Sequence, residues 1–208
     1  MVNIIEALVL YALLFFPRYA GTPASIPFSV GRELSRAFIY NTPAFLLVFY
    51  LLNGNRFRNK SENIVSLRHG LRSFLTFSIV LPVLSLISVC ASAASGFFSP
   101  AAPSPALEKP SDAAGWLVLT VACLTTGLLE ETFFRVYLPK RFSSAGAPLS
   151  FLLSTALFAL SHLYEGPWGM ANAFLAGLFL CVVFAKTKNL AGVAAAHGVY
   201  NLLVYAAS

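Results

Sequence analysis

Residues 127–141 have the sequence GLLEETFFRVYLPKR, which places two adjacent glutamates and an arginine inside an otherwise apolar helical segment. Only 8 of the 208 residues are acidic, so neighbouring carboxyl groups in such a segment need a physical explanation. An ionisable side chain at the centre of a bilayer costs about 3 kcal/mol or more, and such residues usually mark a functional site. The first question is therefore whether this segment lies in a membrane.

The composition of the chain is that of a membrane protein. It is 58% hydrophobic and 11% charged, whereas about 25% of a soluble domain is charged. The net charge of +6 comes from basic residues scattered between apolar segments, which is typical of topology signals and lipid-headgroup contacts. We expect an all-α, polytopic membrane helix bundle, one domain over residues 1–208, that contacts the lipid bilayer and no nucleic acid.

Seven apolar segments approach the roughly 20 residues that cross a bilayer. They lie near residues 2–16, 35–52, 71–95, 115–138, 149–163, 168–185 and 190–206. Residues 96–114 are rich in Ala, Ser and Pro and predict a flexible connection. This connection divides a group of N-terminal helices (1–95) from a C-terminal group (115–206) that contains the two adjacent glutamates.

Basic residues in the loops predict the orientation of the helices. The connections expected in the cytoplasm carry Arg56, Arg58, Lys60, Arg68 and Arg72, then Lys140 and Arg141, then Lys186 and Lys188. Arg18, Arg32 and Arg36 do not fit, because alternation places their connection outside. Either the first segment does not cross the membrane, or part of 22–36 lies along the interface. Small size and compact loops favour the bacterial plasma membrane, with the endoplasmic reticulum as the alternative.

Helical spacing separates the two glutamates. Glu131 and Arg135 stand four residues apart on one helical face, where they can form an ion pair. Glu130 points about 100° away from them, which leaves it for chemistry. The alternative is a purely structural arrangement in which both glutamates pack around Arg135.

Two more polar pairs occur in the apolar segments that follow. Phe158 and His162 end one segment, and His197 and Asn201 stand four residues apart in the last. At about 1.5 Å per residue, Glu130 and His162 lie roughly 18–20 Å from the cytoplasmic end, and Asn201 lies roughly 16 Å from it. We therefore expect a carboxylate, two histidines and an amide to line one polar cavity.

Together the patterns resemble the EExxxR, FxxxH and HxxxN motifs of the CAAX prenyl protease and bacteriocin-processing family, also called Abi or CPBP. In this sequence the motifs are Glu130-Glu131-x-x-x-Arg135, Phe158-x-x-x-His162 and His197-x-x-x-Asn201. The resemblance covers about 115–206 and implies about eight membrane helices, one more than the segments counted above. It implies a glutamic-type intramembrane endopeptidase. Eukaryotic members remove the last three residues of prenylated proteins, and many bacterial members serve in bacteriocin immunity or have unknown substrates.

The resemblance also implies a role for each motif residue. Glu130 and His162 would activate a water molecule for attack on a peptide carbonyl. His197 and Asn201 would donate hydrogen bonds to the oxyanion that forms. Phe158 would pack beside the site. The substrate would be a membrane-associated protein or peptide, and no cofactor is expected.

Zinc bound by Glu130, His162 and His197 is the alternative mechanism, because one glutamate and two histidines form a known catalytic ligand set. The sequence lacks a His-Glu-x-x-His motif. A metal-bound histidine also needs an acceptor for its second ring nitrogen, and Glu131 is expected to be committed to Arg135 as a supporting ion pair. Both points favour a metal-free site.

Two other functions stay open at this point. A proton-coupled transporter also buries acids and histidines, but transporters usually have broken helices and repeat symmetry, which we do not find in the sequence. A non-catalytic immunity or binding protein could keep the same residues as a polar core.

Overall fold

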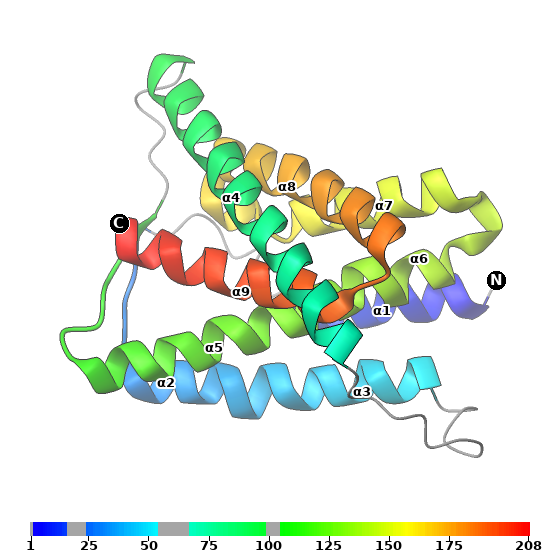
Figure 1. The fold of residues 1–208 in the computed structure, drawn as a ribbon, viewed down its shortest axis with the longest axis horizontal. Coiled ribbons are helices and arrows are strands. Elements are labelled where there is room, and N and C mark those ends of the chain that lie inside the picture. The colour runs from blue at the N-terminus through cyan, green and yellow to red at the C-terminus, as the bar shows by residue number, and fades with distance from the viewer. Residues whose placement is uncertain (1, 16–23, 54–66, 99–104) are drawn as a thin grey trace.

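The computed structural model describes residues 2–15, 24–53, 67–98 and 105–208, which form a helical bundle with one short strand pair (Figure 1). The helices are α1 (Val2–Phe15), α2 (Val30–Leu34), α3 (Thr42–Asn53), α4 (Leu67–Phe98), α5 (Ala113–Glu131), α6 (Leu138–Arg141), α7 (Ala147–Leu160), α8 (Gly166–Thr187) and α9 (Leu190–Ala207). Two π-helical stretches, Ser35–Asn41 and Thr132–Tyr137, join α2 to α3 and α5 to α6. The predicted all-α class is confirmed.

Among the described residues, five helical stretches are long and apolar enough to cross a membrane. They are Val30–Asn53, Gly70–Phe98, Ala113–Arg141, Leu163–Thr187 and Leu190–Ala207. The two other predicted segments, 2–16 and 149–163, coincide with shorter apolar helices, Ile4–Phe15 and Ala147–Leu160. Five of the seven predicted segments therefore have the length of a membrane span, and two are apolar but short.

The helix Ala113–Arg141 is the most buried of the five candidate spans, and α9 packs along it. Two glycines allow the two backbones to approach closely. A Cβ atom added to Gly127 would lie 2.6 Å from a carbonyl oxygen of α9, and one added to Gly198 would lie 2.8 Å from the backbone of α5. Because Glu130 follows the first glycine by one turn and His197 precedes the second, this contact brings two motifs together.

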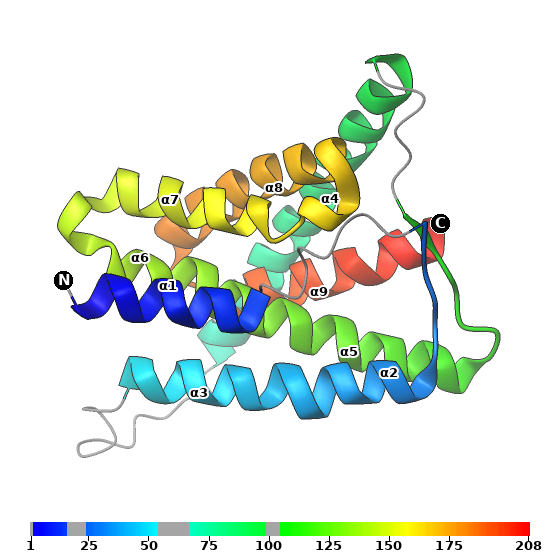
Figure 2. The same cartoon turned by 180° about the vertical axis from the view of Figure 1, so that it is seen from behind.

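Helix α1 covers the motif helices from one side, next to α6 and α7 (Figure 2). The ring of Phe15 packs against Phe133 and Phe134, with ring centroids 5.2 and 4.9 Å apart. The hydroxyl of Tyr11 donates to the carbonyl of Leu157 at 2.9 Å. Although α1 is short, it therefore holds α7 and the π-helical stretch 132–137 in place.

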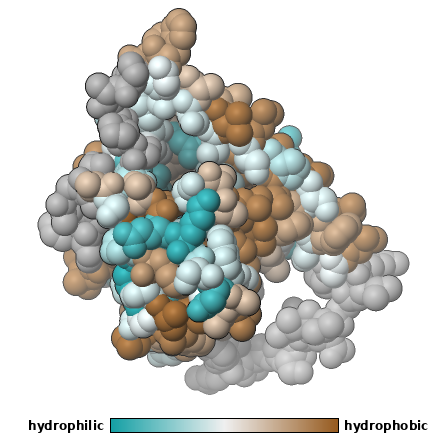
Figure 3. All heavy atoms as spheres, turned by 90° about the vertical axis from the view of Figure 1, so that its left-hand side faces the viewer, coloured by the Kyte–Doolittle hydropathy of each residue, from teal (hydrophilic) through white to brown (hydrophobic). Residues whose placement is uncertain are grey.

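Part of the predicted connection 96–114 has regular structure. Helix α4 continues to Phe98, and the strands β1 (Ser25–Ile26) and β2 (Ala106–Leu107) pair in parallel. The Asp112 side chain accepts from the Gly115 amide at 2.7 Å and caps α5. Figure 3 shows this end of the molecule, where hydrophilic residues gather between hydrophobic areas. Residues 99–104 lie outside the described part of the chain.

The structure explains two of the three arginines that did not fit the predicted orientation of the helices. Arg32 and Arg36 lie in the first turns of the helix Val30–Asn53, and they form ion pairs of 2.8 and 2.6 Å with the buried Glu33. They are therefore helix residues, not loop residues. Other residues used to predict the orientation lie outside the described residues: Arg18, Arg56, Arg58 and Lys60, together with the side chain of Arg68.

Candidate active site

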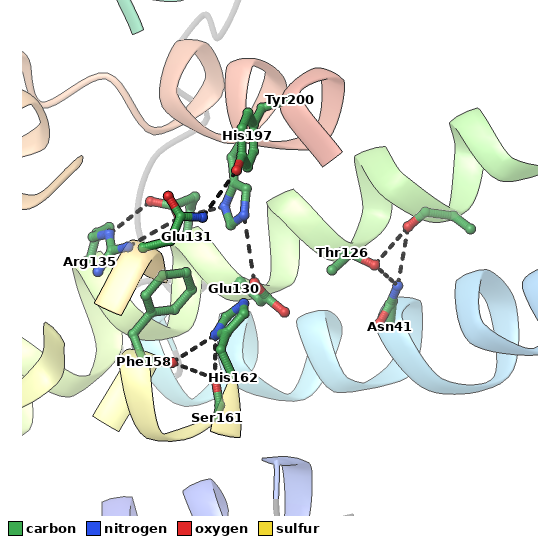
Figure 4. Close-up of polar contacts among 12 residues, drawn as sticks. Asn41, Thr126, Glu130, Glu131, Arg135, Phe158, Ser161, His162, His197 and Tyr200 are labelled. Atoms are coloured by element: carbon green, nitrogen blue, oxygen red, sulfur yellow. Dashed lines mark hydrogen bonds and ion pairs between the residues drawn. The ribbon is translucent and has the colours of Figure 1, made fainter. Parts of the chain in front are cut away.

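The predicted site residues come from three helices that meet in the interior of the bundle (Figure 4). Four of them are almost completely buried: Glu130 (1% exposed), Glu131 (0%), Arg135 (1%) and His197 (4%). His162, directly after α7, and Asn201, on α9, are half-buried. The π-helical stretch begins immediately after Glu131 and carries Arg135. Such stretches are rare in proteins, and those that occur often lie at functional sites.

The expected ion pair between Glu131 and Arg135 is present. The Nε atom of Arg135 donates to Oε2 of Glu131 at 2.9 Å, and a second guanidinium nitrogen lies 3.4 Å from Oε1. The structure adds a partner that the sequence did not predict, because Nδ1 of His197 lies 2.8 Å from the same Oε1 atom. Glu131 therefore joins α5 to α9, and the expectation that it is committed to Arg135 alone is wrong.

This contact determines the tautomer of His197. A carboxylate can only accept, so Nδ1 of His197 donates to Glu131, and Nε2 carries a hydrogen only when the ring is protonated. Nε2 lies 3.8 Å from Oε2 of Glu130. A protonated His197 and Arg135 together balance the two carboxylates, whereas a neutral His197 leaves a net negative charge in a buried group, which is costly. The arrangement favours an imidazolium that faces Glu130.

His162 has the complementary tautomer. Its Nδ1 atom lies 2.8 Å from the carbonyl oxygen of Phe158 and 3.2 Å from the hydroxyl of Ser161. Because a carbonyl can only accept, Nδ1 is the donor and the Nε2 atom of the neutral ring has a lone pair. In Figure 4 the ring of His162 points in the direction of Glu130. His162 can thus accept a hydrogen bond from water at Nε2, and His197 can donate one.

Phe158 lies among the charged groups and fixes their positions. Its ring centroid is 4.6 Å from that of His162 and 5.9 Å from that of His197, and Cζ of Arg135 lies 4.7 Å from the ring centre. A guanidinium over an aromatic face is favourable, more so where water is excluded. Phe158 therefore packs between both histidines and the arginine.

Asn201 is placed less closely. It lies one turn after His197 on α9, and its side chain makes no hydrogen bond to another residue in the described part of the chain. Its amide is thus available to a substrate. Cys181 becomes apparent as a neighbour of the site only in the structure: its sulfur lies 3.6 Å from the Arg135 guanidinium and 3.3 Å from the Thr155 hydroxyl.

The contact of Glu131 with His197 changes one argument about zinc. Glu131 supplies the acceptor that a metal-bound histidine would need, so its expected commitment to Arg135 no longer counts against a metal. Within the described ranges, no three His, Cys, Asp or Glu side chains are grouped as metal ligands. Metal dependence stays a prediction for experiment.

Comparison with known proteins gives one match. Residues 112–203 match the model of a family described as type II CAAX prenyl endopeptidase Rce1-like. No curated protein and no solved structure matches the chain. The matched segment begins at the N-cap of α5 and contains all three motifs together with α7, α8 and most of α9. The resemblance to the CAAX prenyl protease family is thereby confirmed: residues 112–203 are Rce1-like.

Proposed function

We propose that this chain is an intramembrane endopeptidase that hydrolyses a peptide bond of a membrane-associated protein or peptide. The Rce1-like match supports peptidase activity. The observation that carries the proposal is the unequal setting of the two adjacent carboxylates. Glu131 is held by Arg135 and by Nδ1 of His197, while Glu130 faces Nε2 of His197 at 3.8 Å. One carboxylate organises the site, and the other is placed for proton transfer.

In the proposed reaction, a water molecule binds between Glu130 and Nε2 of His162. Glu130 takes a proton from this water molecule while the water oxygen attacks the scissile carbonyl carbon. The attack gives a tetrahedral intermediate. The oxyanion of this intermediate accepts hydrogen bonds from Nε2 of the protonated His197 and from the amide of Asn201. The proton on Glu130 then moves to the amine nitrogen, the C–N bond breaks, and a carboxylic acid and an amine leave.

The ion pair Glu131–Arg135 takes no part in proton transfer in this scheme. Its role is to hold His197 with Nε2 directed at the oxyanion. Preorganised donors of this kind act strongly in a site from which water is excluded, and loss of one typically lowers kcat by about 10²–10³-fold. The scheme uses no metal ion, and its most direct rival is a zinc-bound water held by Glu130 and the two histidines.

The substrate is best sought in cells. We propose the bacterial plasma membrane as the location, so C-terminal peptides would be quantified in membranes of cells that carry the wild type, Glu130→Gln or a matched Glu108→Gln control. Glu108 is exposed and lies at the end of the bundle near β2. Peptides that appear with wild type and control but not with Glu130→Gln would identify the substrate. Identical peptide sets in all three strains would contradict a peptidase and favour a non-catalytic binding or immunity protein.

A further inference from the structure

A second polar pair joins α8 to α9 beside the site. The Nδ2 atom of Asn172 donates to the hydroxyl oxygen of Tyr200 at 3.2 Å. Tyr200 stands three residues after His197 and directly before Asn201, so it continues the same part of α9. Figure 4 shows Tyr200 next to His197. The residue that follows Asn172, Ala173, is buried in the same apolar cluster as Phe158.

This pair leaves at least one acceptor and one donor unused. The Oδ1 atom of Asn172 is buried and has no hydrogen-bond partner among the described residues. The Tyr200 hydroxyl accepts from Asn172, and within the described ranges its own hydrogen has no acceptor. If oxygen and nitrogen of the Asn172 amide are exchanged, the unused groups become the amide N–H groups and a hydroxyl lone pair, so at least one donor and one acceptor remain in either orientation.

An adjacent donor and acceptor match the N–H and C=O of one residue in an extended peptide, which point to the same side of the chain. A backbone N–H needs an acceptor and a backbone C=O needs a donor, and an extended peptide provides both. Within the hydrocarbon region a substrate backbone cannot use water for this purpose, so the protein has to supply the partners. A bound cation would use only the acceptor and a bound anion only the donor.

We propose that Asn172 and Tyr200 bind the backbone of one substrate residue away from the scissile bond, with the N–H of that residue donating to Oδ1 of Asn172 and its C=O accepting from the Tyr200 hydroxyl. The inference rests on the proposed function and adds a binding subsite to it. Tyr200 and Asn172 are positioning residues here: they fix the peptide relative to Glu130 and take no part in bond cleavage. Their loss therefore raises KM and leaves kcat almost unchanged.

The test uses purified full-length protein in liposomes and an isoprenylated, internally quenched CAAX peptide as probe. In matched probes, each backbone amide except the scissile one is replaced in turn by an ester, which removes the N–H. We expect one ester position to raise KM about tenfold for the wild type and to have no effect on Asn172→Leu. Tyr200→Phe should raise KM for the unmodified probe by a similar factor, with kcat within about twofold. Tyr205→Phe, on the same helix, is the matched control.

The outcomes separate this inference from the function on which it rests. Cleavage of the probe by Glu130→Gln at the wild-type rate would contradict the proposed function. If Glu130→Gln is inactive but Tyr200→Phe has the wild-type KM, the subsite alone is overturned. The same conclusion follows if the ester probe still raises KM in Asn172→Leu. If Asn172→Leu does not accumulate, the test is made with Tyr200→Phe and the ester series. Tyr200→Phe is the milder substitution, because it removes only one hydroxyl group.

Discussion

Two buried glutamates in this bundle pair with arginines in different ways. Glu131 has no exposed surface, and its partner Arg135 has none either. Glu33 is equally buried, but its partners Arg32 and Arg36 keep 36% and 33% of their side-chain surface exposed. Glu33 lies at the start of a helix, whereas Glu131 lies near the middle of the long helix 113–141. The same pair of residue types thus occurs at an end and in the interior of the bundle.

The comparison separates an ion pair at a helix end from one in the candidate active site. At a helix end, long arginine side chains can reach water or lipid headgroups, so each charge keeps part of its solvation. In the interior, Glu131 and Arg135 depend on each other and on His197, and a change in one leaves the others uncompensated. A buried glutamate–arginine pair therefore does not by itself mark a site. The interior pair differs from the Glu33 pairs because a second carboxylate, that of Glu130, and two histidines lie beside it.

The largest expected effect is the loss of turnover in Glu130→Gln. The amide cannot take a proton from water, so we expect hydrolysis to fall to background, while the folded protein stays abundant because the Glu131–Arg135 pair is intact. The same substitution in the other cluster, Glu33→Gln, should leave turnover detectable. Activity would be measured on purified proteins at equal concentration. Equal rates for wild type and Glu130→Gln would refute the catalytic assignment.

The next effect concerns stability. Removal of one partner from a buried ion pair typically costs about 3–5 kcal/mol, and we expect this loss for Arg135→Ala and for Glu131→Gln. Arg36→Ala should cost about 1 kcal/mol or less, because its pair is partly solvated and Arg32 remains. Melting temperature and abundance in detergent would measure the difference. Equal losses for Arg135→Ala and Arg36→Ala would show that the two clusters do not differ as described.

A smaller effect is expected for His197→Ala. Loss of one oxyanion donor should slow turnover by about 10²–10³-fold, without a change in metal content. Active wild-type protein should contain far less than stoichiometric zinc and should keep its activity in a strong chelator. Zinc at one ion per chain, with activity lost on chelation and regained on zinc addition, would show that the metal-free scheme is wrong.

A fourth prediction places the two clusters relative to the cytoplasm. In a chain with the exposed Cys90 replaced by serine, a cysteine at Ser144 should react with an impermeant thiol reagent only after the membrane is opened. A cysteine at Ser111, at the opposite end, should react in intact cells. Both positions are exposed, and the remaining cysteines are buried. Reversed labelling would invert the orientation and place the Glu33 end inside.

Local patterns in the sequence were sufficient for the helices and for one contact of the site. Hydropathy identified all seven apolar helices, and the spacing of four residues identified the Glu131–Arg135 pair. The contact between Glu131 and His197 joins residues 66 positions apart, so it depends on how α5 and α9 pack. The burial of Glu33 was missed because its neighbours Arg32 and Arg36 suggested a loop. The pairing of Ser25–Ile26 with Ala106–Leu107 is too short to leave an alternating pattern.

The length of α7 has a consequence for the surrounding lipid. Its 14 residues rise about 21 Å, roughly 9 Å less than the hydrocarbon thickness of a typical bilayer. If its first turn lies at the headgroups beside Arg141, its last turn and His162 lie below the opposite surface. A bilayer adapts to such hydrophobic mismatch by local thinning, which shortens the distance that hydrolytic water has to travel to the site. We therefore expect faster turnover of a substrate peptide in short-chain than in long-chain phosphatidylcholine vesicles, in which case membrane thickness would set the rate.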